Sequence, residues 1–341
     1  MARSLIWYRV TATPAPILVT GAGGFTGLAL TRALTARGHS VRALARKPGQ
    51  VPELERTGAE VLQGDIRDPE IIRRSVDGRA VVFHLAAVFR RAGVPDSLYR
   101  EVHVDATRDL IEAASSAGVR RFVHCSTVGV HGDISGDGPA DENAPMAPGD
   151  IYQRTKLEGE AAARETAARV GLPLTVVRPG PIYGPEDRRL LKLIGGVARR
   201  RFLLLGSGKP HFQMVYVDDL VEGLRLAAER PEAVGRTYIL TGEEAPTLRE
   251  LVQEIAAIAR VPAPRVRLPV WPFWVAGALC EAVCVPFGLE PPIYRRRVKF
   301  FTNNRWFDTS RARAELGFMP RMPLREGLRR TLDSYRTLGW V

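Results

Sequence analysis

The sequence predicts an α/β protein with a doubly wound parallel sheet and a smaller, mostly helical C-terminal region. Short β-branched runs alternate with helical patterns over the first half of the chain, which is typical of a parallel sheet covered on both faces. This strand rhythm stops after Pro179, where Pro, Gly and Arg become denser. The 341 residues and the hydrophobic fraction of 45% suit a substantial core and exclude disorder over most of the length.

The first half contains the strand and helix patterns that define the expected sheet. Six buried strands are expected at 17–20, 41–44, 60–63, 80–85, 122–125 and 174–178. Helices are expected at 28–37, 71–76, 106–117 and 152–170, and a last helix at 324–338. We divide the chain into an N-terminal extension (1–14), a sheet domain (15–180) and a second region (181–341).

Charge and cysteine content restrict the partners and the compartment. Lys and Arg number 49 against 37 Asp and Glu, and the formal net charge of +12 favours anionic partners. No helix-turn-helix or aromatic-and-basic RNA motif stands out, so nucleic acid is not expected. Cys125, Cys280 and Cys284 have neither the number for a disulfide framework nor zinc-site spacing. We therefore expect no metal and a reducing, cytoplasmic location.

The longest apolar stretch runs from Val270 to Leu289. Pro272, Glu281 and Pro286 interrupt it, so its continuous part is too short to span a bilayer. It could form a helix that lines an apolar substrate pocket or packs in the core. Because Arg295–Arg297 lie close by in sequence, it could instead rest on an anionic membrane surface as a peripheral contact.

A glycine-rich turn follows the first strand and opens the first helix. It reads Thr20-Gly21-Ala22-Gly23-Gly24-Phe25-Thr26-Gly27, with glycines at 21, 24 and 27. Glycine permits the tight turn and the close approach of the backbone to a pyrophosphate, and the helix start presents free N–H groups to it. In this strand–turn–helix context the motif predicts a Rossmann-type dinucleotide site formed by Gly21, Gly24, Phe25, Thr26 and Gly27.

The ends of the second and third strands indicate which nucleotide binds. Arg46 and Lys47 follow the second strand, and no acid stands at 44–47. A cation here accommodates the extra phosphate of NADP, whereas an acid would bind the ribose of NAD. We therefore predict NADP as the preferred cofactor, with NAD as the alternative. Asp65, followed by Ile66, is placed to accept from the adenine amino group, or else it caps the next helix.

Tyr152 and Lys156 lie four residues apart at the start of the fourth predicted helix, which places them on one helix face. A phenol titrates near pH 10 and is a poor acid–base catalyst alone, but a nearby ammonium favours the phenolate. The pair therefore predicts proton transfer at a reacting oxygen. Ser126 and Thr127 end the fifth strand, where a hydroxyl could contact a substrate carbonyl or simply cap a loop.

Together these motifs resemble the extended short-chain dehydrogenase/reductase superfamily, which includes the NAD(P)-dependent epimerase/dehydratases. The resemblance covers nearly the whole chain, including His84–Ala87, Arg178–Pro185 and Val215–Leu220. It implies that Tyr152 is the acid/base, that Lys156 holds the nicotinamide ribose, and that Thr127 is the catalytic hydroxyl. It also implies that part of the second region, near 212–242, returns to the sheet. Further cofactor contacts are implied at Leu85, Ala86, Ala87, Ser126, Pro179 and Ile182.

One position departs from the family pattern, because His103 stands where the family usually has Asn. Val41–Arg46 and the stretch from Pro291 to Phe318 look most like the branch of 3β-hydroxysteroid dehydrogenases and dihydroflavonol reductases. This branch implies a reductase or dehydrogenase acting on a hydrophobic small molecule. We also expect a homodimer. A nucleotide-sugar epimerase or dehydratase, using cations such as Arg188 and Arg189, is the second hypothesis. A non-catalytic NADP(H) sensor is the third, although the Tyr–Lys pair is intact.

Overall fold

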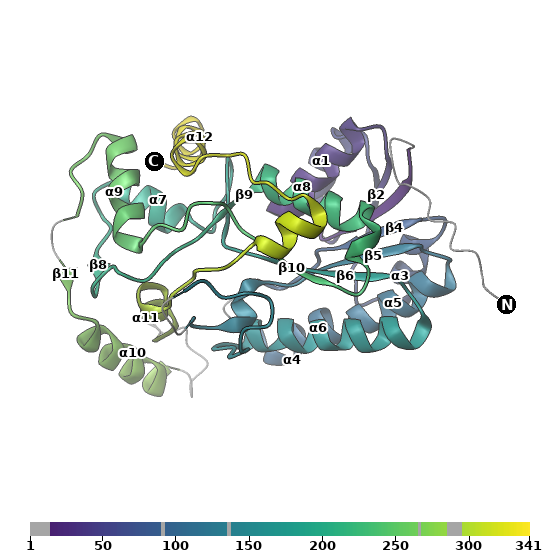
Figure 1. Ribbon diagram of the computed structural model, residues 1–341, viewed down its shortest axis with the longest axis horizontal. Helices are drawn as coiled ribbons and strands as arrows, with labels where there is room; N and C mark the ends of the chain where they lie inside the picture. Colours follow the sequence, from purple (N-terminus) through teal and green to yellow (C-terminus); the bar gives the residue numbers. More distant parts are fainter. Residues whose placement is uncertain (1–13, 90–92, 135–137, 265–266, 285–294) are drawn as a thin grey trace.

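The structure, a computed structural model, describes residues 14–89, 93–134, 138–264, 267–284 and 295–341. Seven parallel strands form its main sheet, in the order β10-β6-β5-β4-β1-β2-β3 (Figure 1). These strands are β1 (Pro16–Thr20), β2 (Ser40–Ala45), β3 (Glu60–Gln63), β4 (Val81–His84), β5 (Arg121–Cys125), β6 (Leu174–Pro179) and β10 (Thr237–Leu240).

The strand order reverses between β1 and β4, from which the chain builds the sheet outward in both directions. Because all paired strands are parallel, their carboxyl ends share one edge of the sheet. In open α/β sheets a ligand binds outside this edge at the point of reversal. The topology therefore places a ligand site beyond the ends of β1 and β4.

Helices cover both faces of the sheet, as the sequence predicts (Figure 1). One face carries α1 (Phe25–Ala36) and α8 (Val217–Glu229), and the other carries α3 (Pro69–Val76), α5 (Ala106–Ser116) and α6 (Ile151–Val170). Short helices α2 (Val51–Glu55) and α4 (Asp96–Arg100) lie in the connections.

The apolar strand sequences follow from this two-sided cover. Along β1 and β2, Leu18 and Leu44 face one core, whereas Val19 and Ala43 face the other, because successive side chains point to opposite faces. Each of these residues is almost fully buried. A fully buried leucine contributes about 1.5–3 kcal/mol relative to an exposed one, so continuous apolar strands are required here.

The second region packs around its own core at the left of Figure 1. Helices α7 (Leu191–Ala198), α9 (Leu248–Ala259) and α12 (Leu324–Thr337) supply most of this core. Two small parallel sheets pair β7 (Ile182–Tyr183) with β9 (Val215–Tyr216), and β8 (Leu204–Leu205) with β11 (Arg267–Leu268). Helices α10 (Val270–Cys284) and α11 (Arg295–Thr302) pack against each other below it.

All six predicted strands are confirmed, and each strand end lies within one residue of its predicted position. Helix α1 begins at Phe25 rather than Leu28, because Gly24 already serves as its N-cap. In the expected return segment, α8 packs on α1 and β10 pairs with β6 at the edge of the sheet. The proposed extension over 1–14 lies outside the described residues except for Pro14.

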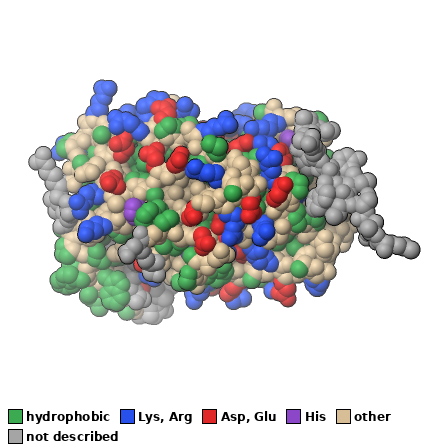
Figure 2. Space-filling model, in the orientation of Figure 1, with side chains coloured by type: hydrophobic (Ala, Val, Ile, Leu, Met, Phe, Trp, Pro, Cys, Tyr) green, Lys and Arg blue, Asp and Glu red, His purple; other side chains and the backbone are tan. Residues whose placement is uncertain are grey.

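Helix α10 exposes much of its apolar surface. Trp271 is 70% exposed, and Trp274, Val275, Leu279 and Val283 are exposed as well. Figure 2 shows hydrophobic side chains gathered at the lower left, over the place of α10 in Figure 1. The interpretation of this segment as a core helix is wrong, since only Gly277 is buried. No helix among the described residues combines the length and apolarity needed to cross a membrane.

Candidate active site

The carboxyl edge of the sheet gathers the predicted site residues from six strands. Each strand ends in a segment that the sequence singled out, and parallel pairing brings these segments to one edge. The segments are Gly21–Gly27 after β1, Arg46 and Lys47 after β2, Asp65 and Ile66 after β3, Leu85–Ala87 after β4, Ser126 and Thr127 after β5, and Pro179 at the end of β6 with Ile182 just beyond.

The glycine turn has steric reasons for its residues. Gly21 has φ of +67°, and a Cβ on it would lie 2.8 Å from the backbone of Ala86. A Cβ on Gly27 would lie 2.2 Å from the Gly21 carbonyl oxygen, so only glycine lets α1 approach β1. No side chain caps the start of α1. These free amides and the exposed Gly24 fit a pyrophosphate.

The side chains after Gly24 connect the turn to the second region. Thr26 is buried, and the Phe25 ring lies beneath the Arg189 guanidinium at 4.8 Å. Gln50 closes the outer side of the turn by donating from Nε2 to the Gly23 carbonyl oxygen at 2.7 Å. The turn is thus held from two sides before any ligand binds.

Arg46, Lys47 and Asp65 lie where the adenosine end of a dinucleotide is expected. The Arg46 guanidinium is 3.9 Å from the Asp65 carboxylate and is partly exposed. Arg67 binds the same carboxylate through Nε and Nη2. Burial raises the pKa of Asp65, but these arginine contacts outweigh it and hold the pKa below its usual range. Asp65 does not cap α3, because Asp68 takes that position.

Lys156 is fixed beneath the end of β5. Its side chain is 3% exposed, and Nζ donates to the Cys125 carbonyl oxygen at 2.6 Å. Burial lowers the pKa of this ammonium. A buried cation directed at the strand end next to Ser126 and Thr127 can bind a ribose hydroxyl and stabilise a neighbouring phenolate.

Tyr152 lies one helical turn before Lys156 and is only partly buried. Its ring makes T-shaped contacts with the Phe89 ring, at a centroid distance of 5.1 Å, and with the His103 ring, at 5.7 Å. These contacts fix the phenol between an exposed aromatic side chain and the buried interior. The arrangement leaves an apolar surface beside the predicted acid/base.

Ser126 and Thr127 both lie at the end of β5, as predicted. Ser126 is buried, whereas Thr127 is partly exposed. Thr127 Oγ1 accepts from the Gly129 amide at 3.1 Å and caps the short 3-10 turn Val128–His131. Its hydroxyl hydrogen remains available to a substrate oxygen, so the capping and catalytic interpretations are compatible.

A buried chain of hydrogen bonds beneath the site was not expected from the sequence. Thr20 Oγ1 is 2.8 Å from His84 Nδ1, and His84 Nε2 is 3.0 Å from Thr107 Oγ1. Because Thr107 Oγ1 donates to the His103 carbonyl oxygen, it must accept from His84, which assigns the proton to Nε2. Burial lowers the pKa of His84 to about 3, so this histidine is neutral.

His103 continues this chain to the catalytic helix. Its Nε2 accepts from the Val88 amide at 3.0 Å, so Nδ1 carries the proton and donates to Thr155 Oγ1 at 2.8 Å. Burial lowers its pKa to about 2. His103, which stands in place of the usual Asn, therefore joins the loop after β4 to α6. In the sequence, the only sign of this contact was the unusual residue at position 103.

A buried ion pair on the other side of α6 also escaped the sequence analysis. Arg178 donates to both carboxylate oxygens of Glu160 at 3.0 and 2.6 Å, and both side chains are almost fully buried. Arg178 Nη1 also binds the Glu142 carbonyl oxygen and lies 3.1 Å from His131 Nε2. This network joins α6, β6 and the loop that precedes Tyr152.

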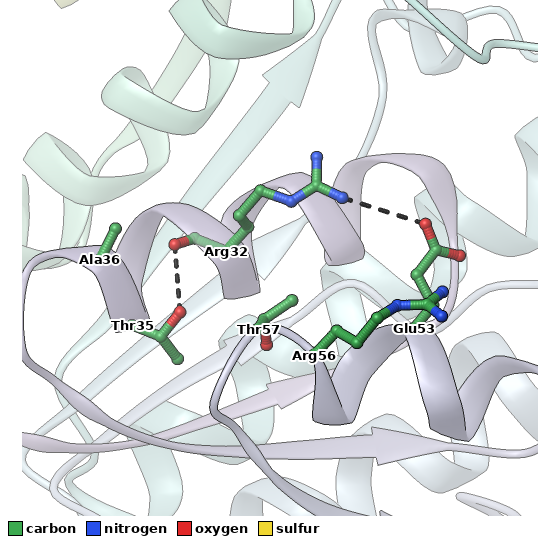
Figure 3. Close-up of a pocket in the computed structure, with 6 residues that line it drawn as sticks. All are labelled: Arg32, Thr35, Ala36, Glu53, Arg56 and Thr57. Carbon is green, nitrogen blue, oxygen red and sulfur yellow. Dashed lines mark hydrogen bonds and ion pairs between the residues drawn. The ribbon is translucent and has the colours of Figure 1, made fainter.

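A surface hollow between α1 and α2 is unrelated to these residues. Figure 3 shows Arg32, Thr35 and Ala36 of α1 facing Glu53, Arg56 and Thr57 across it. An Arg32–Glu53 contact of 3.9 Å spans the hollow. Because α1 starts at the carboxyl edge of the sheet and runs away from it, its last turn lies toward the opposite edge. The hollow contains no predicted site residue.

The fold and the site together define an enzyme of the extended short-chain dehydrogenase/reductase type. Residues 17–240 match the family described as the NAD dependent epimerase/dehydratase family. The chain belongs to this family.

Relatives with assigned names resemble the chain over most of their length. The 2-alkyl-3-oxoalkanoate reductase of Stenotrophomonas maltophilia is 33% identical, over 92% of this chain and 97% of its own. Sterol demethylase protein B of Methylococcus capsulatus is 33% identical, over 89% of this chain and 93% of its own length. The crystal structure of gox2253 superposes with a TM-score of 0.82 at 31% identity, over 96% of this chain and 99% of its own.

Proposed function

We propose that this protein is an NADP(H)-dependent oxidoreductase that transfers hydride between the nicotinamide and a hydroxyl or ketone of a hydrophobic substrate. The observation that supports it most is the placement of Lys156. Its ammonium is held at the end of β5 by the Cys125 carbonyl oxygen, one helical turn from Tyr152 and beside Thr127. This placement joins the predicted acid/base to the predicted dinucleotide site.

The side chains have distinct chemical tasks in this proposal. When bound, the cofactor would supply or accept the hydride. Tyr152 donates the proton to the substrate oxygen in reduction and accepts it in oxidation. Lys156 stabilises the phenolate and holds the ribose, and Thr127 donates a hydrogen bond to the same oxygen. Gly21, Gly24 and Gly27 position the pyrophosphate.

The surface beside Tyr152 favours a hydrophobic substrate. Phe89 packs on the Tyr152 ring and is 49% exposed. Two relatives are named for a 2-alkyl-3-oxoalkanoate and for sterol demethylation, and both names describe largely apolar compounds. The relatives and the apolar surface therefore support the same substrate class.

A nucleotide-sugar epimerase is the second candidate. One relative from Escherichia coli O157:H7, 28% identical, is named as a 4-epimerase of a diphospho-undecaprenol-linked sugar. Arg188 and Arg189, two of the cations available to a substrate diphosphate, and the nearby Arg199 already contact protein groups. Arg189 pairs with Asp187 at 2.7 Å, Arg188 lies over Trp340, and Arg199 binds the Trp340 carbonyl oxygen. We therefore rank the epimerase below the reductase.

The test follows the cofactor during turnover. NADPH should be consumed in proportion to product with one of a panel of β-oxo acids, ketosteroids and flavanones. Conversion of a nucleotide sugar without net cofactor consumption would favour the epimerase instead. Tyr152→Phe should lower kcat by about 10²–10⁴-fold, because it removes the transferable proton. Its NADPH affinity should match that of the native protein, and undiminished activity would refute the role of Tyr152.

The preference for NADP rests on Arg46 and Lys47. The Arg46 guanidinium is partly exposed at the end of β2 and can bind a phosphate with two donors, and Lys47 follows it. Two structures of similar fold are described with NAD bound, so a preference for NADP would set this chain apart from them. Dissociation constants for NADPH and NADH provide the test, and tighter binding of NADH would contradict the proposal.

Peripheral contact with an anionic membrane is also proposed, through the exposed face of α10. This face carries Trp271, Trp274, Leu279 and Val283, and Glu281 is the one charged residue of α10. Helix α11, which begins with three arginines in sequence, packs on α10. Flotation with vesicles containing anionic lipid should recover the protein, whereas neutral vesicles should recover less. A homodimer and a cytoplasmic location stay predictions, to be checked by sedimentation and by cell fractionation.

A further inference from the structure

The loop between β7 and α7 brings a cation from the second region to the glycine turn. The Arg189 guanidinium lies 4.8 Å from the centre of the Phe25 ring. Phe25 is the first residue of α1, and the amides of a first helical turn have no acceptor within their helix. The guanidinium therefore lies close to the N–H groups that the turn presents to a pyrophosphate.

Two further observations place Arg189 at the carboxyl edge of the sheet. Its Nη2 donates to the Ile182 carbonyl oxygen at 3.3 Å, just beyond the end of β6. Burial raises the pKa of the Cys125 thiol at the end of β5, and the charges of Lys156 and Arg189 oppose this rise. Because such an electrostatic effect requires proximity, the guanidinium lies near both the start of α1 and the end of β5. Between β1 and β5 lies only β4, so this is the point of strand reversal where a ligand is expected.

A buried carboxylate fixes the direction of this guanidinium. Asp187 is fully buried, and its Oδ1 accepts from Arg189 Nε at 2.7 Å while its Oδ2 accepts from the Leu190 amide at 3.2 Å. The hydroxyl of Tyr335 in α12 donates to the Asp187 carbonyl oxygen. A buried carboxylate is costly unless it is paired, so this arrangement holds the loop and the arginine in one position before a ligand binds.

The contacts with the protein leave part of the guanidinium available. Arginine has five N–H donors, and these contacts use Nε and Nη2. Within the part of the chain that the structure describes, no acceptor binds Nη1, and the Arg189 side chain is 30% exposed. The Asp187 carboxylate, by contrast, is withdrawn from solvent. The accessible side of this pair is therefore its positive side.

We propose that Arg189 binds the diphosphate of the dinucleotide cofactor together with the amides at the start of α1. This inference rests on the dinucleotide site of the proposed function and adds a residue to that site. A guanidinium donates well-directed hydrogen bonds to phosphate oxygens, and its charge offsets that of the diphosphate. Because α1 belongs to the sheet domain and Arg189 to the second region, both parts of the chain hold the bound cofactor.

The test measures the binding of ADP-ribose, which carries the diphosphate but no nicotinamide, by isothermal titration calorimetry. Arg189→Met should weaken this binding by about tenfold or more, the worth of a hydrogen bond between charged groups. The dissociation constants of NADPH and NADH should rise by the same factor, because both carry this diphosphate. Binding should also depend less steeply on salt concentration in the variant, since one ion pair with the ligand is lost.

Matched variants separate phosphate binding from folding. Arg189→Lys should retain most of the affinity, because it keeps the charge. Asp187→Asn combined with Arg189→Met leaves no buried carboxylate unpaired, and it should weaken ADP-ribose binding as much as Arg189→Met alone. Arg188→Met removes the neighbouring cation, which lies over Trp340, and should change the dissociation constant by less than about twofold.

The binding of UDP, measured in parallel, distinguishes a cofactor diphosphate from a substrate diphosphate. Weaker binding of UDP with unchanged binding of ADP-ribose would overturn the proposal and assign Arg189 to the substrate. Unchanged binding of both, an equal loss with Arg188→Met, or a loss without any change in salt dependence would overturn it as well. None of these results bears on hydride transfer, so the oxidoreductase would stand. If the native protein bound neither NADPH, NADH nor ADP-ribose, the proposed function itself would fail.

Discussion

Strand β6 and helix α10 are both rich in apolar residues, but the protein places these residues in opposite surroundings. Every residue of β6 is buried between two helical layers, whereas α10 has only Gly277 buried among its described side chains. Apolar composition therefore indicates that surface must be covered, but the neighbouring elements decide what covers it. In β6 the cover is α6 and α8, and in α10 much of the cover must come from outside the described chain.

The two regions also differ in how they treat charge. The sheet region buries Arg178 and Glu160 as a doubly bonded pair and buries Lys156 on a backbone carbonyl. Helix α10 carries one charged side chain, Glu281, among its exposed apolar residues. Substitutions of the buried charged groups in the sheet region should therefore lower the free energy of unfolding. Substitutions on α10 should change mainly the binding of whatever surface covers this helix.

The largest effect is expected from Glu160→Gln. Removing one partner of a buried ion pair leaves Arg178 uncompensated, which costs about 3–5 kcal/mol in the free energy of unfolding. Glu165→Gln, on the exposed side of the same helix, should cost less than about 0.5 kcal/mol. Urea denaturation measures both, and similar stabilities of the two variants would contradict the contrast.

The same pair has a defined dependence on pH. Burial raises the pKa of Glu160, but the Arg178 contacts lower it more, and the pKa lies below its usual value of 4.5. The stabilisation is therefore complete above about pH 4.5 and is lost as pH falls through the lower pKa of the folded state. Glu160→Gln should flatten this acid limb of the stability profile.

An intermediate effect is expected from His103→Asn, which restores the residue usual in the family. His103 has a pKa of about 2 when folded and about 6.5 when unfolded, so only the unfolded chain binds the proton between these values. The contribution of His103 is full above pH 6.5 and falls by about 1.4 kcal/mol per pH unit below it, in addition to a similar loss from His84, whose pKa burial also lowers. Asn should remove the His103 share of this slope, and an unchanged loss between pH 7 and 5.5 would show that His103 does not contribute to it.

The smallest effect on folding is expected on α10. Trp271→Ser combined with Leu279→Ser should change the free energy of unfolding by less than about 1 kcal/mol, because both side chains are mostly exposed. Leu110→Ser in α5, which is fully buried, should cost several times more and provides the matched control. If the α10 double variant were as unstable as the α5 variant, α10 would belong to the core after all.

The local patterns explain which parts of the fold were predictable. Strands such as Pro16–Thr20 are short, mostly apolar runs with clear breaks, and buried parallel strands have that form by necessity. The helical second region was predictable only in outline. The burial of α10 depends on whether neighbouring elements reach it, and that information is not carried by the residues from Val270 to Cys284 themselves.

The site was predictable where one motif carries its own geometry. The glycine turn and the Tyr152–Lys156 spacing are local, so the sequence alone indicated them. The contacts of His103 with Val88 and Thr155 join three separate segments, and no spacing along the chain encodes them. Arg189 was considered for a substrate diphosphate, but its place over Phe25 depends on the fold of the loop after β7 and became visible only in the structure.

The edge position of β10 has a consequence for the protein during synthesis. Residues 237–240 complete the sheet beside β6. The helix before them, α8, is tied to a later part of the chain, because the Asp219 carboxylate accepts hydrogen bonds from the backbone amides of Arg321 and Met322. A nascent chain that stops near residue 200 thus presents the bare edge of β6, a surface prone to unwanted pairing. A fragment ending at residue 180 would be a poor vehicle for studying dinucleotide binding, because the last strand and its helix are missing.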